Sequence, residues 1–378
     1  MILPVLILAS ITAGEIGAAL VLLLTLTPSV RRKLAAIPRD LYVPLAVFAA
    51  WAFLSMAAFA PSAGNARDIL AKWSFAFLII LGFAAALSAS QVKRAVLILA
   101  AAAVVLFPYY LWSFFATEYG RARALSGGAP NLGTNLMLIA IVILPLALES
   151  RRRAAWLAWG SLLILLVALG LTLNRAALLG AAAGLVLASG RRWPAVLATM
   201  VAGAACLLIL FPGSRAAHRV RSIVSYRTSF TSLERLNMWL AGTRMVRARP
   251  FQGFASRRNF ISEYSARYRD PNSIEATPGH VHNSPLQVAI LHGIPGLGLL
   301  AWFFTVLWVK SWRLFAAAGR APSGTARPLA QALFPLLIAF LVNAQFDFVV
   351  ADGQRAMMFY ALFGLILGSV TENRARPA

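Results

Sequence analysis

The residues best suited to chemistry lie in one short segment that contains His280, His282 and Asn283. Histidine is the side chain most easily poised as a base near neutral pH, and the Asn283 amide could orient an imidazole or a substrate hydroxyl. Two other interpretations stay open, because the histidines could be solvated at a membrane surface or could belong to a metal site. A metal ion needs further ligands, and the chain holds only 4 histidines and 12 acidic residues, so we predict no metal.

Arg175 supplies a second signal, a charge at the edge of two apolar runs. An arginine held at membrane depth costs about 2.5 kcal/mol or more, so such residues usually face a wet cavity. The alternative is an arginine at a helix end whose head group reaches the membrane surface. A guanidinium group forms paired hydrogen bonds with phosphate, so the first interpretation predicts an anionic ligand.

Arg235 supplies a third signal, at the expected start of a helix. Thr231 and Glu234 have the spacing of a capping box, in which a hydroxyl and a carboxylate satisfy free backbone donors. Pro250 is predicted to end this helix and Gly253 to form a turn. A helix N-terminus beside an arginine makes an anion site, whereas the alternative is an arginine on a solvated surface. Further candidates for anion binding are Arg215, Arg219, Arg221, Arg227, Arg244, Arg247 and Arg249.

Long apolar runs must position these residues. The chain is 60% hydrophobic and only 12% charged, against about 45–50% and about 25% in a soluble domain. A membrane span needs about 20 apolar residues, which predicts an all-α integral membrane protein of about 11–12 transmembrane helices. The candidate spans are 3–27, 41–60, 69–89, 94–115, 131–148, 154–173, 175–190, 193–211, 286–309, 329–347 and 355–371. The sequence Gly293-Ile-Pro-Gly296 is predicted to break the start of one of them, so that its backbone lines a cavity.

The distribution of basic residues predicts the orientation of the chain. Alternate short connections carry 17 lysines and arginines and the others carry 6, and cytoplasmic connections are the ones enriched in these residues. The segment 212–285 then lies outside the cytoplasm, between an N-terminal bundle (1–211) and C-terminal helices (286–378). It holds 12 arginines and no lysine, which again predicts an anionic ligand. Nucleic acid is excluded as a partner, because the positive charge is scattered among apolar spans.

These segments resemble the O-antigen ligase and polymerase superfamily of lipid-linked glycan transferases. The resemblance rests on their order: Leu171-Thr-Leu-Asn-Arg175-Ala-Ala-Leu-Leu-Gly180, Glu234-Arg235-Leu-Asn-Met-Trp239, Arg249-Pro250-Phe-Gln-Gly253, His280-Val-His282-Asn283-Ser-Pro-Leu-Gln287 and Gly293-Ile-Pro-Gly296. Gly296 stands where some ligases of this superfamily have a hydroxyl residue.

The resemblance implies a helical bundle like that of GT-C glycosyltransferases, with a long helical periplasmic loop, in the bacterial inner membrane. It implies a glycan donor on undecaprenyl diphosphate, a lipid A-core or glycan acceptor, contact with membrane lipids, inversion at the anomeric carbon and no cofactor. His282 would be the base, and Arg175 and Arg235 would hold the diphosphate. The expected substrate-binding residues are His280, Asn283, Arg215, Arg219, Arg221 and Trp239.

Functions other than ligation to lipid A-core stay open. A polymerase of O-antigen or exopolysaccharide would use another lipid-linked unit as acceptor, and a protein O-oligosaccharyltransferase would use a protein. A transporter of anionic lipids or solutes would also explain the spans and arginines, although it would not require the histidine segment.

Overall fold

The computed structural model describes residues 37–84, 88–116, 120–125, 127–150, 152–210, 213, 230–320 and 324–375, together with positions 4, 7, 8 and 16. The predicted span 3–27 lies outside the described residues apart from those four positions. Regular structure within the described residues is helical throughout, which confirms the predicted all-α integral membrane fold.

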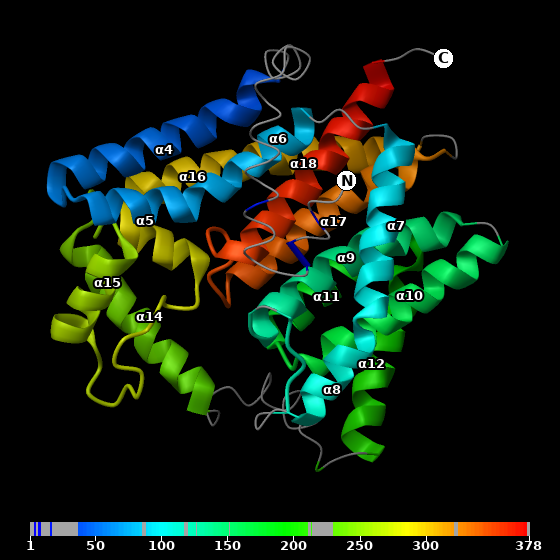
Figure 1. Cartoon of the computed structure of the whole chain (residues 1–378), viewed down its shortest axis with the longest axis horizontal. Helices are drawn as coiled ribbons and strands as arrows, with labels where there is room; N and C mark the ends of the chain where they lie inside the picture. Colours follow the sequence, from blue (N-terminus) through cyan, green and yellow to red (C-terminus); the bar gives the residue numbers. More distant parts are fainter. Residues whose placement is uncertain are drawn as a thin grey trace.

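The helices follow one another along the chain as labelled in Figure 1. The first half contains α4 (Arg39–Phe59), α5 (Ala63–Trp73), η1 (Ser74–Phe77), α6 (Leu78–Ala84), α7 (Ala89–Val105), α8 (Phe107–Ala116), α9 (Ala129–Glu149), α10 (Arg152–Leu171), α11 (Arg175–Ala188), η2 (Gly190–Arg192) and α12 (Trp193–Leu210). The second half contains α14 (Phe230–Ala248), α15 (Arg257–Glu263), η3 (Tyr264–Tyr268), α16 (Ser284–Ala318), α17 (Ala326–Ala344) and α18 (Gly353–Ala375).

Six helical segments are long and apolar enough to cross a membrane, counting only the described residues. They are Arg39–Phe59, Ala89–Ala116, Ala129–Glu149, Ser284–Ala318, Ala326–Ala344 and Gly353–Thr371. Two shorter apolar helices, Ala155–Leu171 and Arg175–Ala188, accompany them. The predicted total of 11–12 spans therefore stays a prediction. The predicted span 69–89 is divided among α5, η1 and α6, because hydropathy marks where a chain can be buried but not where its helical hydrogen bonding changes.

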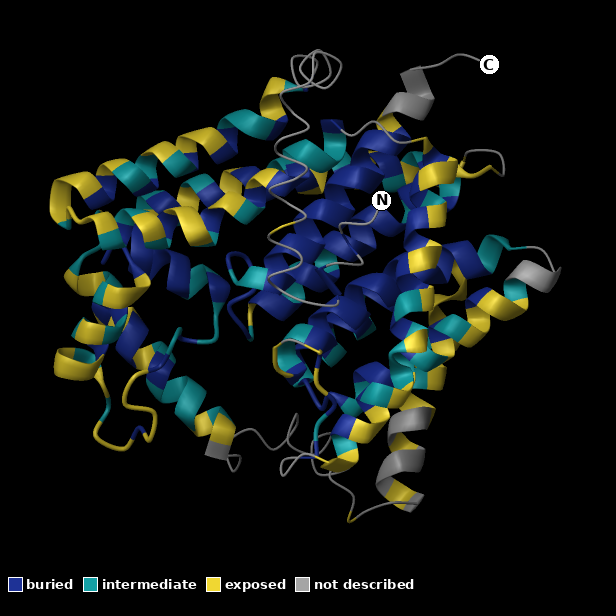
Figure 2. Ribbon diagram, viewed as in Figure 1, coloured by how far each residue is buried: buried dark blue, intermediate teal, exposed yellow. Residues whose placement is uncertain are grey.

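Helix α9 forms the centre of the bundle. It is buried almost all round, as Figure 2 shows, and it packs against α10, α11, α17 and α18. A helix that is apolar on every side belongs in such a position. One polar contact crosses this core, where Asn343 donates to the Thr134 hydroxyl at 2.8 Å. Helices α11 and α17 approach closely because Gly180 has no side chain, and a Cβ there would lie 2.6 Å from the carbonyl oxygen of Ala339.

Helix α16 is kinked at Gly293, whose φ of 71° lies in the left-handed region. This confirms the predicted break at Gly293. Pro295 has no N–H to donate, and the backbone groups freed by the kink bind the connection between α14 and α15. Ile290 and Leu291 accept from the N–H groups of Phe254 and Ala255 at 2.8 and 2.7 Å. The kink therefore fixes the segment predicted to lie outside the membrane, the extramembrane segment (212–285, described from residue 230), on the end of α16.

Polar contacts join connections that the charge pattern places on the same side of the membrane. Lys310 and Asp40, from two connections predicted to be cytoplasmic, form an ion pair at 2.8 Å. On the opposite side, the N–H of Arg257 donates to Asp68 at 2.7 Å. These two contacts agree with the predicted separation of the connections, while the separation itself and the assignment of one set to the periplasm stay predictions.

Candidate active site

The segment that carries the histidines is anchored through the residue between them. The indole of Trp239, on α14, donates to the carbonyl of Val281 at 2.9 Å, and the N–H of Val281 donates to Gln287 on α16 at 2.9 Å. His280 and His282 flank this anchor, and their rings meet edge to face with centroids 4.3 Å apart. Trp239, predicted to bind substrate, therefore positions the backbone of this segment, and its contact with substrate stays a prediction.

Asn283 begins helix α16. Its side-chain oxygen accepts from the N–H of Leu286 at 2.9 Å, which caps the helix, and its amide nitrogen donates to the carbonyl of Gln345 at 3.0 Å. Both ends of the amide thus tie the histidine segment to α16 and to the connection after α17. The orientation of an imidazole or a substrate by Asn283 stays a prediction.

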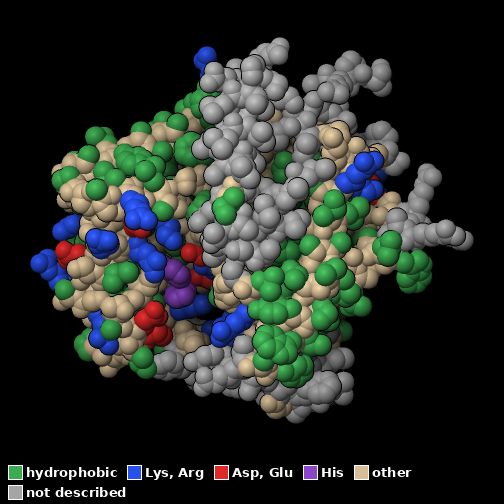
Figure 3. Space-filling view, in the orientation of Figure 1, with side chains coloured by type: hydrophobic (Ala, Val, Ile, Leu, Met, Phe, Trp, Pro, Cys, Tyr) green, Lys and Arg blue, Asp and Glu red, His purple; other side chains and the backbone are tan. Residues whose placement is uncertain are grey.

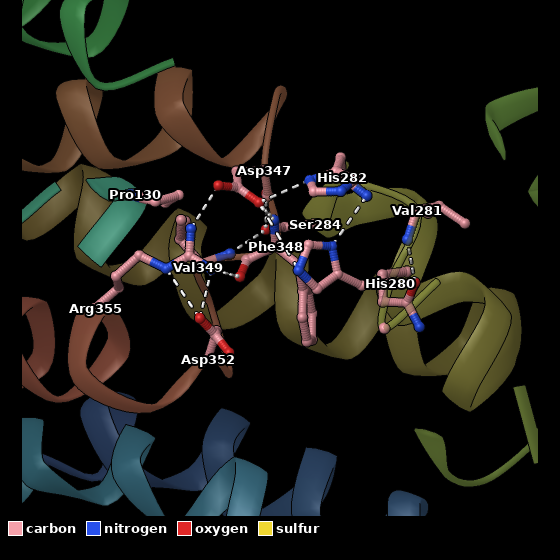
Figure 4. A network of polar contacts seen from close by, with 12 residues as sticks. Pro130, His280, Val281, His282, Ser284, Asp347, Phe348, Val349, Asp352 and Arg355 are labelled. Carbon is pink, nitrogen blue, oxygen red and sulfur yellow. Dashed lines mark hydrogen bonds and ion pairs between the residues drawn. The ribbon is translucent and has the colours of Figure 1, made fainter. Parts of the chain in front are cut away.

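Asp347 joins the two histidines to the C-terminal helices, as Figure 4 shows. Its carboxylate lies 3.2 Å from Nδ1 of His282, 4.0 Å from Nε2 of His280 and 2.5 Å from Nη1 of Arg355. An ionised carboxylate only accepts hydrogen bonds, so Nδ1 of His282 donates to Asp347, and in the neutral imidazole the lone pair lies on Nε2. This arrangement presents Nε2 as a base whose positive charge, once it has taken a proton, Asp347 stabilises.

Arg355 neutralises the carboxylates behind the histidines. It binds Asp347 with one terminal nitrogen and Asp352 with its other two nitrogens, and it is buried. Burial on its own would raise the pKa of Asp347, but Arg355 and the hydrogen bond from His282 hold it well below its usual range. Burial opposes the ionisation of Asp352 as well, and Arg355 again lowers its pKa. Asp347 therefore stays charged when it faces His282.

The two histidines differ in their surroundings. Burial and the adjacent His282 lower the pKa of His280 to about 3. His280 is therefore neutral near physiological pH. One of its ring nitrogens, Nδ1, accepts from the N–H of His282 at 3.3 Å. His280 thus supports the backbone of His282, whose φ is 53°.

His280, His282 and Asp347 also have the spacing of a metal site. One ligand atom from each lies within 4.8 Å of the others. The guanidinium of Arg355 already contacts the same carboxylate, however, and a cation next to a divalent ion is unfavourable. The donor set therefore fits a charged hydrogen-bond network better than a metal centre. The absence of a metal requirement stays a prediction.

A polar cavity of about 310 Å³ opens beside the histidines. In Figure 3 the histidines lie in the hollowed part of this face, among acidic and basic side chains. Charged residues in its lining are Asp68, Lys72, Arg257, Glu275 and Asp352. Trp73, Gln287, His292 and Phe348 contribute to the same wall as His280 and His282.

A second, apolar groove of about 440 Å³ runs between α16 and α17. Its lining includes Leu297, Leu300, Phe304 and Trp308 on α16, and Leu341 on α17. Residues 297–308 extend over about 16 Å of helix axis. Ser284, which follows Asn283, and Gln345, whose carbonyl binds Asn283, lie at one end of the groove. The apolar groove thus begins next to the histidine segment.

The side chain of Arg175 reaches the start of α14, the helix that carries Arg235. Arg175 donates to the hydroxyls of Ser232 and Thr231 at 3.2 and 3.0 Å, and Arg235 lies half-buried on the same helix. Neither is among the described residues that line the polar cavity. Arg215, Arg219 and Arg221 lie outside the described residues.

The predicted capping box is wrong. Helix α14 begins at Phe230, so Thr231 is already helical. The carboxylate of Glu234 accepts instead from the hydroxyl of Ser273 and from the N–H groups of Ile274 and Glu275, at 3.2 and 3.0 Å for the last two. Three donors from a connection distant in sequence bind the Glu234 carboxylate more strongly than one local donor would. A pattern of neighbouring residues does not reveal such distant donors. Pro250 and Gly253 do follow the end of α14, and Gly253 has a φ of 66°, as predicted.

Several other arginines in this region hold its backbone together. Arg244 donates to the carbonyl of Tyr268 at 3.0 Å, Arg257 to that of Gly279 at 3.1 Å, and Arg269 to that of Ser273 at 2.6 Å. The excess of arginine in 212–285 therefore has a structural cause in addition to the predicted anionic ligand.

Sequence reasoning missed the residues that complete the site behind His282. Arg355 is not among the predicted site residues, and neither are Asp347 and Asp352. A signal was present, because these two residues are among only 12 acids in the chain and lie between two apolar runs. A carboxylate in such a place is rare and usually has a partner.

Comparison with protein families matches residues 138–301 to the O-antigen ligase family. This match covers somewhat less than half of the chain and supports the predicted resemblance to the O-antigen ligase and polymerase superfamily. Members of this superfamily are glycosyltransferase-like enzymes, and the family implies lipid-linked glycans as substrates. Comparison with curated proteins found no match. The matched part of the superfamily domain includes Arg175, Arg235 and His282, whereas Asp347, Asp352 and Lys72 lie outside it.

Proposed function

We propose that the protein is a glycosyltransferase of the O-antigen ligase type, acting at the periplasmic face of the bacterial inner membrane. It transfers a glycan from undecaprenyl diphosphate to lipid A-core, without a metal ion and with inversion at the anomeric carbon. The observation that carries this proposal is the pairing of Asp347 with Nδ1 of His282, since it leaves Nε2 as a base beside a polar cavity.

The reaction needs a stronger nucleophile and a stabilised leaving group. Nε2 of His282 removes the proton of the acceptor hydroxyl as its oxygen bonds to the anomeric carbon of the donor. The bond from that carbon to the diphosphate oxygen breaks, and its electron pair leaves with the diphosphate. Arg175 and Arg235 neutralise the developing charge, and one well-placed contact of this kind is worth about 3 kcal/mol in the barrier.

The apolar groove supports a lipid-linked donor. A polyprenyl chain has no polar groups and would pack along Leu297, Phe304 and Trp308 with its diphosphate toward the histidine segment. The groove ends at Ser284 and Gln345, which both contact the network around Asp347 and Asn283. A chain in this groove would therefore place the scissile bond close to His282.

The test uses purified protein in vesicles with undecaprenyl-diphosphate-linked glycan and lipid A-core. We expect the native chain to make a covalent glycan–lipid product, and His282→Ala and Arg235→Ala to insert normally but make none. Asp347→Asn keeps the shape of the side chain but loses the charge, so transfer should fall about 100-fold or more. Asp270→Asn removes a carboxylate of the same extramembrane segment that is not among the described lining residues, and should leave transfer unchanged.

Two further arms of this assay test the lipid groove and the alternatives. Ala301→Trp fills the groove and should raise the KM for the lipid-linked donor, while chelation by EDTA should not change the rate. Product formation by both His282→Ala and Arg235→Ala would refute the assignment. Polymer that stays on the lipid diphosphate would identify a polymerase, glycosylated protein would identify a protein O-oligosaccharyltransferase, and movement of the donor without bond cleavage would identify a transporter.

A further inference from the structure

We propose that the polar cavity beside the histidines binds the terminal saccharide of the acceptor, and that Lys72 and Glu275 select the sugar that enters. This inference rests on the proposed function and assigns the acceptor and the diphosphate to different places. The cavity is walled by α5, by the start of α15 and by the connection before α16. Arg175 and Arg235, which would bind the diphosphate, are not among its described lining residues.

The charge of the lining favours a neutral ligand over a diphosphate. Asp68, Glu275 and Asp352 contribute three carboxylates, against the two cations Lys72 and Arg257. Because Arg355 binds Asp352 from outside the lining, these charges nearly balance, so a diphosphate in this cavity would find no net positive charge to neutralise it. The hydroxyls of a sugar can both donate and accept, so a saccharide can use donors and acceptors of either charge.

Most of these charged groups are already bound within the protein. Asp68 accepts from the N–H of Arg257, and Arg257 donates to the carbonyl of Gly279. Asp352 is held by two nitrogens of Arg355. These contacts shape the cavity but leave these groups less free to bind a ligand.

The side chains of Lys72 and Glu275 make no hydrogen bond within the part of the chain that the structure describes. The ammonium of Lys72 lies 3.9 Å from Asp352, an ion pair too long for a hydrogen bond. Glu275 uses its backbone N–H to bind Glu234, whereas its carboxylate is exposed at the cavity. One donor and one acceptor that lack hydrogen-bond partners, facing the same cavity as His282, are the groups that discriminate between sugars with different hydroxyl arrangements.

Aromatic residues complete the match to a sugar. Trp73 and Phe348 line the cavity with the small part of each residue that is exposed, 4% and 6%, and aromatic surface suits the C–H face of a pyranose. The indole of Trp73 is fixed in place, because it donates to Nε2 of His292 at 2.9 Å and packs edge-on against Phe48 at 4.5 Å. A volume of about 310 Å³ is at the lower end of small-molecule sites, which run from about 300 to about 1,000 Å³. The cavity therefore suits a terminal sugar rather than a lipid chain.

The experiment measures acceptor and donor separately for Lys72→Gln and Glu275→Gln. Each variant keeps most of the side chain but removes the charge, and each should raise the KM for the acceptor about tenfold. The KM for the undecaprenyl-diphosphate-linked donor, and slow hydrolysis of that donor by water, should stay within about twofold of the native protein. Matched controls are Lys93→Gln and Asp270→Asn, which are not among the described lining residues and should change neither KM.

A binding measurement separates this proposal from the proposed function. Delipidated core oligosaccharide is titrated calorimetrically into the native chain and both variants, since binding requires no turnover. We expect the native chain to bind it and both variants to bind it about tenfold more weakly. The subsite would be overturned if the acceptor KM did not change, if the donor KM rose equally, or if the native chain did not bind the oligosaccharide. Failure of transfer with intact binding would overturn only the proposed function.

Discussion

At the scale of residues, the site is a network in which one arginine serves two carboxylates and two imidazoles lie in front of them. Arg355 contacts Asp347 and Asp352, and Asp347 contacts His282. Removing water from these groups would be costly for any one charge alone, and the pairing offsets that cost. The consequence is a fixed imidazole rather than a mobile one, and fixed geometry is what a positioned base requires.

Acid is expected to weaken the folded protein through His280. Its folded pKa is about 3, whereas the ordinary value is 6.5, so between these values the unfolded chain binds a proton that the folded chain does not. The stability of the folded state should therefore fall by about 2 kcal/mol between pH 7 and pH 5. Asp347 does not contribute in this range, because its lowered pKa affects stability only below about 3.8.

The thermal unfolding midpoint in detergent at pH 7 and pH 5 measures this effect. In the His280→Asn variant position 280 no longer titrates, so the unfolding midpoint of this variant should fall less than that of the native chain between pH 7 and pH 5. Equal declines in the two proteins would show that His280 accepts a proton in the folded state at ordinary pH.

At the scale of elements, the kink of α16 determines where the histidine segment lies. The kink frees carbonyl groups that bind the connection after α14, and Asn283 caps the same helix at its start. The indole of Trp51, on α4, also donates to the carbonyl of His292 at 2.8 Å. One break in one helix therefore holds α4, the extramembrane segment and the site together.

Gly293→Ala is expected to destabilise this arrangement strongly. Gly293 has a φ of 71°, and a Cβ there would overlap the carbonyl oxygen of Phe251. The strained backbone alone costs about 1–3 kcal/mol, and the overlap adds to this. We expect a lower thermal midpoint and less transfer.

Gly298→Ala is the matched control in the same helix, because a Cβ there meets no atom within 4 Å. Alanine favours the helix more than glycine does, by about 1 kcal/mol, so this variant should unfold at the same temperature as the native chain or higher. If both variants unfold like the native chain, the kink does not hold the segment as described.

At the scale of the whole molecule, the polar site occupies one end of an apolar bundle. Charged side chains gather around the histidines, while apolar ones cover much of the lower right of the face seen in Figure 3. Lys310 and Asp40, on connections predicted to be cytoplasmic, pair with each other rather than with residues of the site. The molecule therefore has two distinct polar ends, as a membrane-spanning protein requires.

The orientation of these ends is testable by labelling single cysteines in a Cys206→Ser background. Thr277 and Arg320 are both exposed, the first near the site and the second on a connection predicted to be cytoplasmic. We expect a membrane-impermeant maleimide to label Thr277→Cys in spheroplasts, and Arg320→Cys only after the inner membrane is permeabilised. The reverse pattern would place the site in the cytoplasm and exclude a periplasmic ligase.

The sequence by itself determined the features that depend on neighbours along the chain. Apolar runs predicted the helical membrane class, Gly293 and Pro295 predicted the break in α16, and the histidine segment indicated the site. Each rests on local composition or backbone preference. The predicted capping box also rested on neighbouring residues, and it was wrong because the donors to Glu234 come from about 40 residues away.

Only the tertiary structure decided what surrounds His282. Asp347 lies 65 residues from His282 along the chain, and Lys72 reaches the same cavity from α5 in the first half of the sequence. Their meeting depends on how α5, α16 and α18 pack, and packing is set by the shapes of many side chains at once. The absence of Arg175 and Arg235 from the described lining of this cavity is likewise a property of the packed bundle, because side chains distant in sequence become neighbours only when helices are arranged in space.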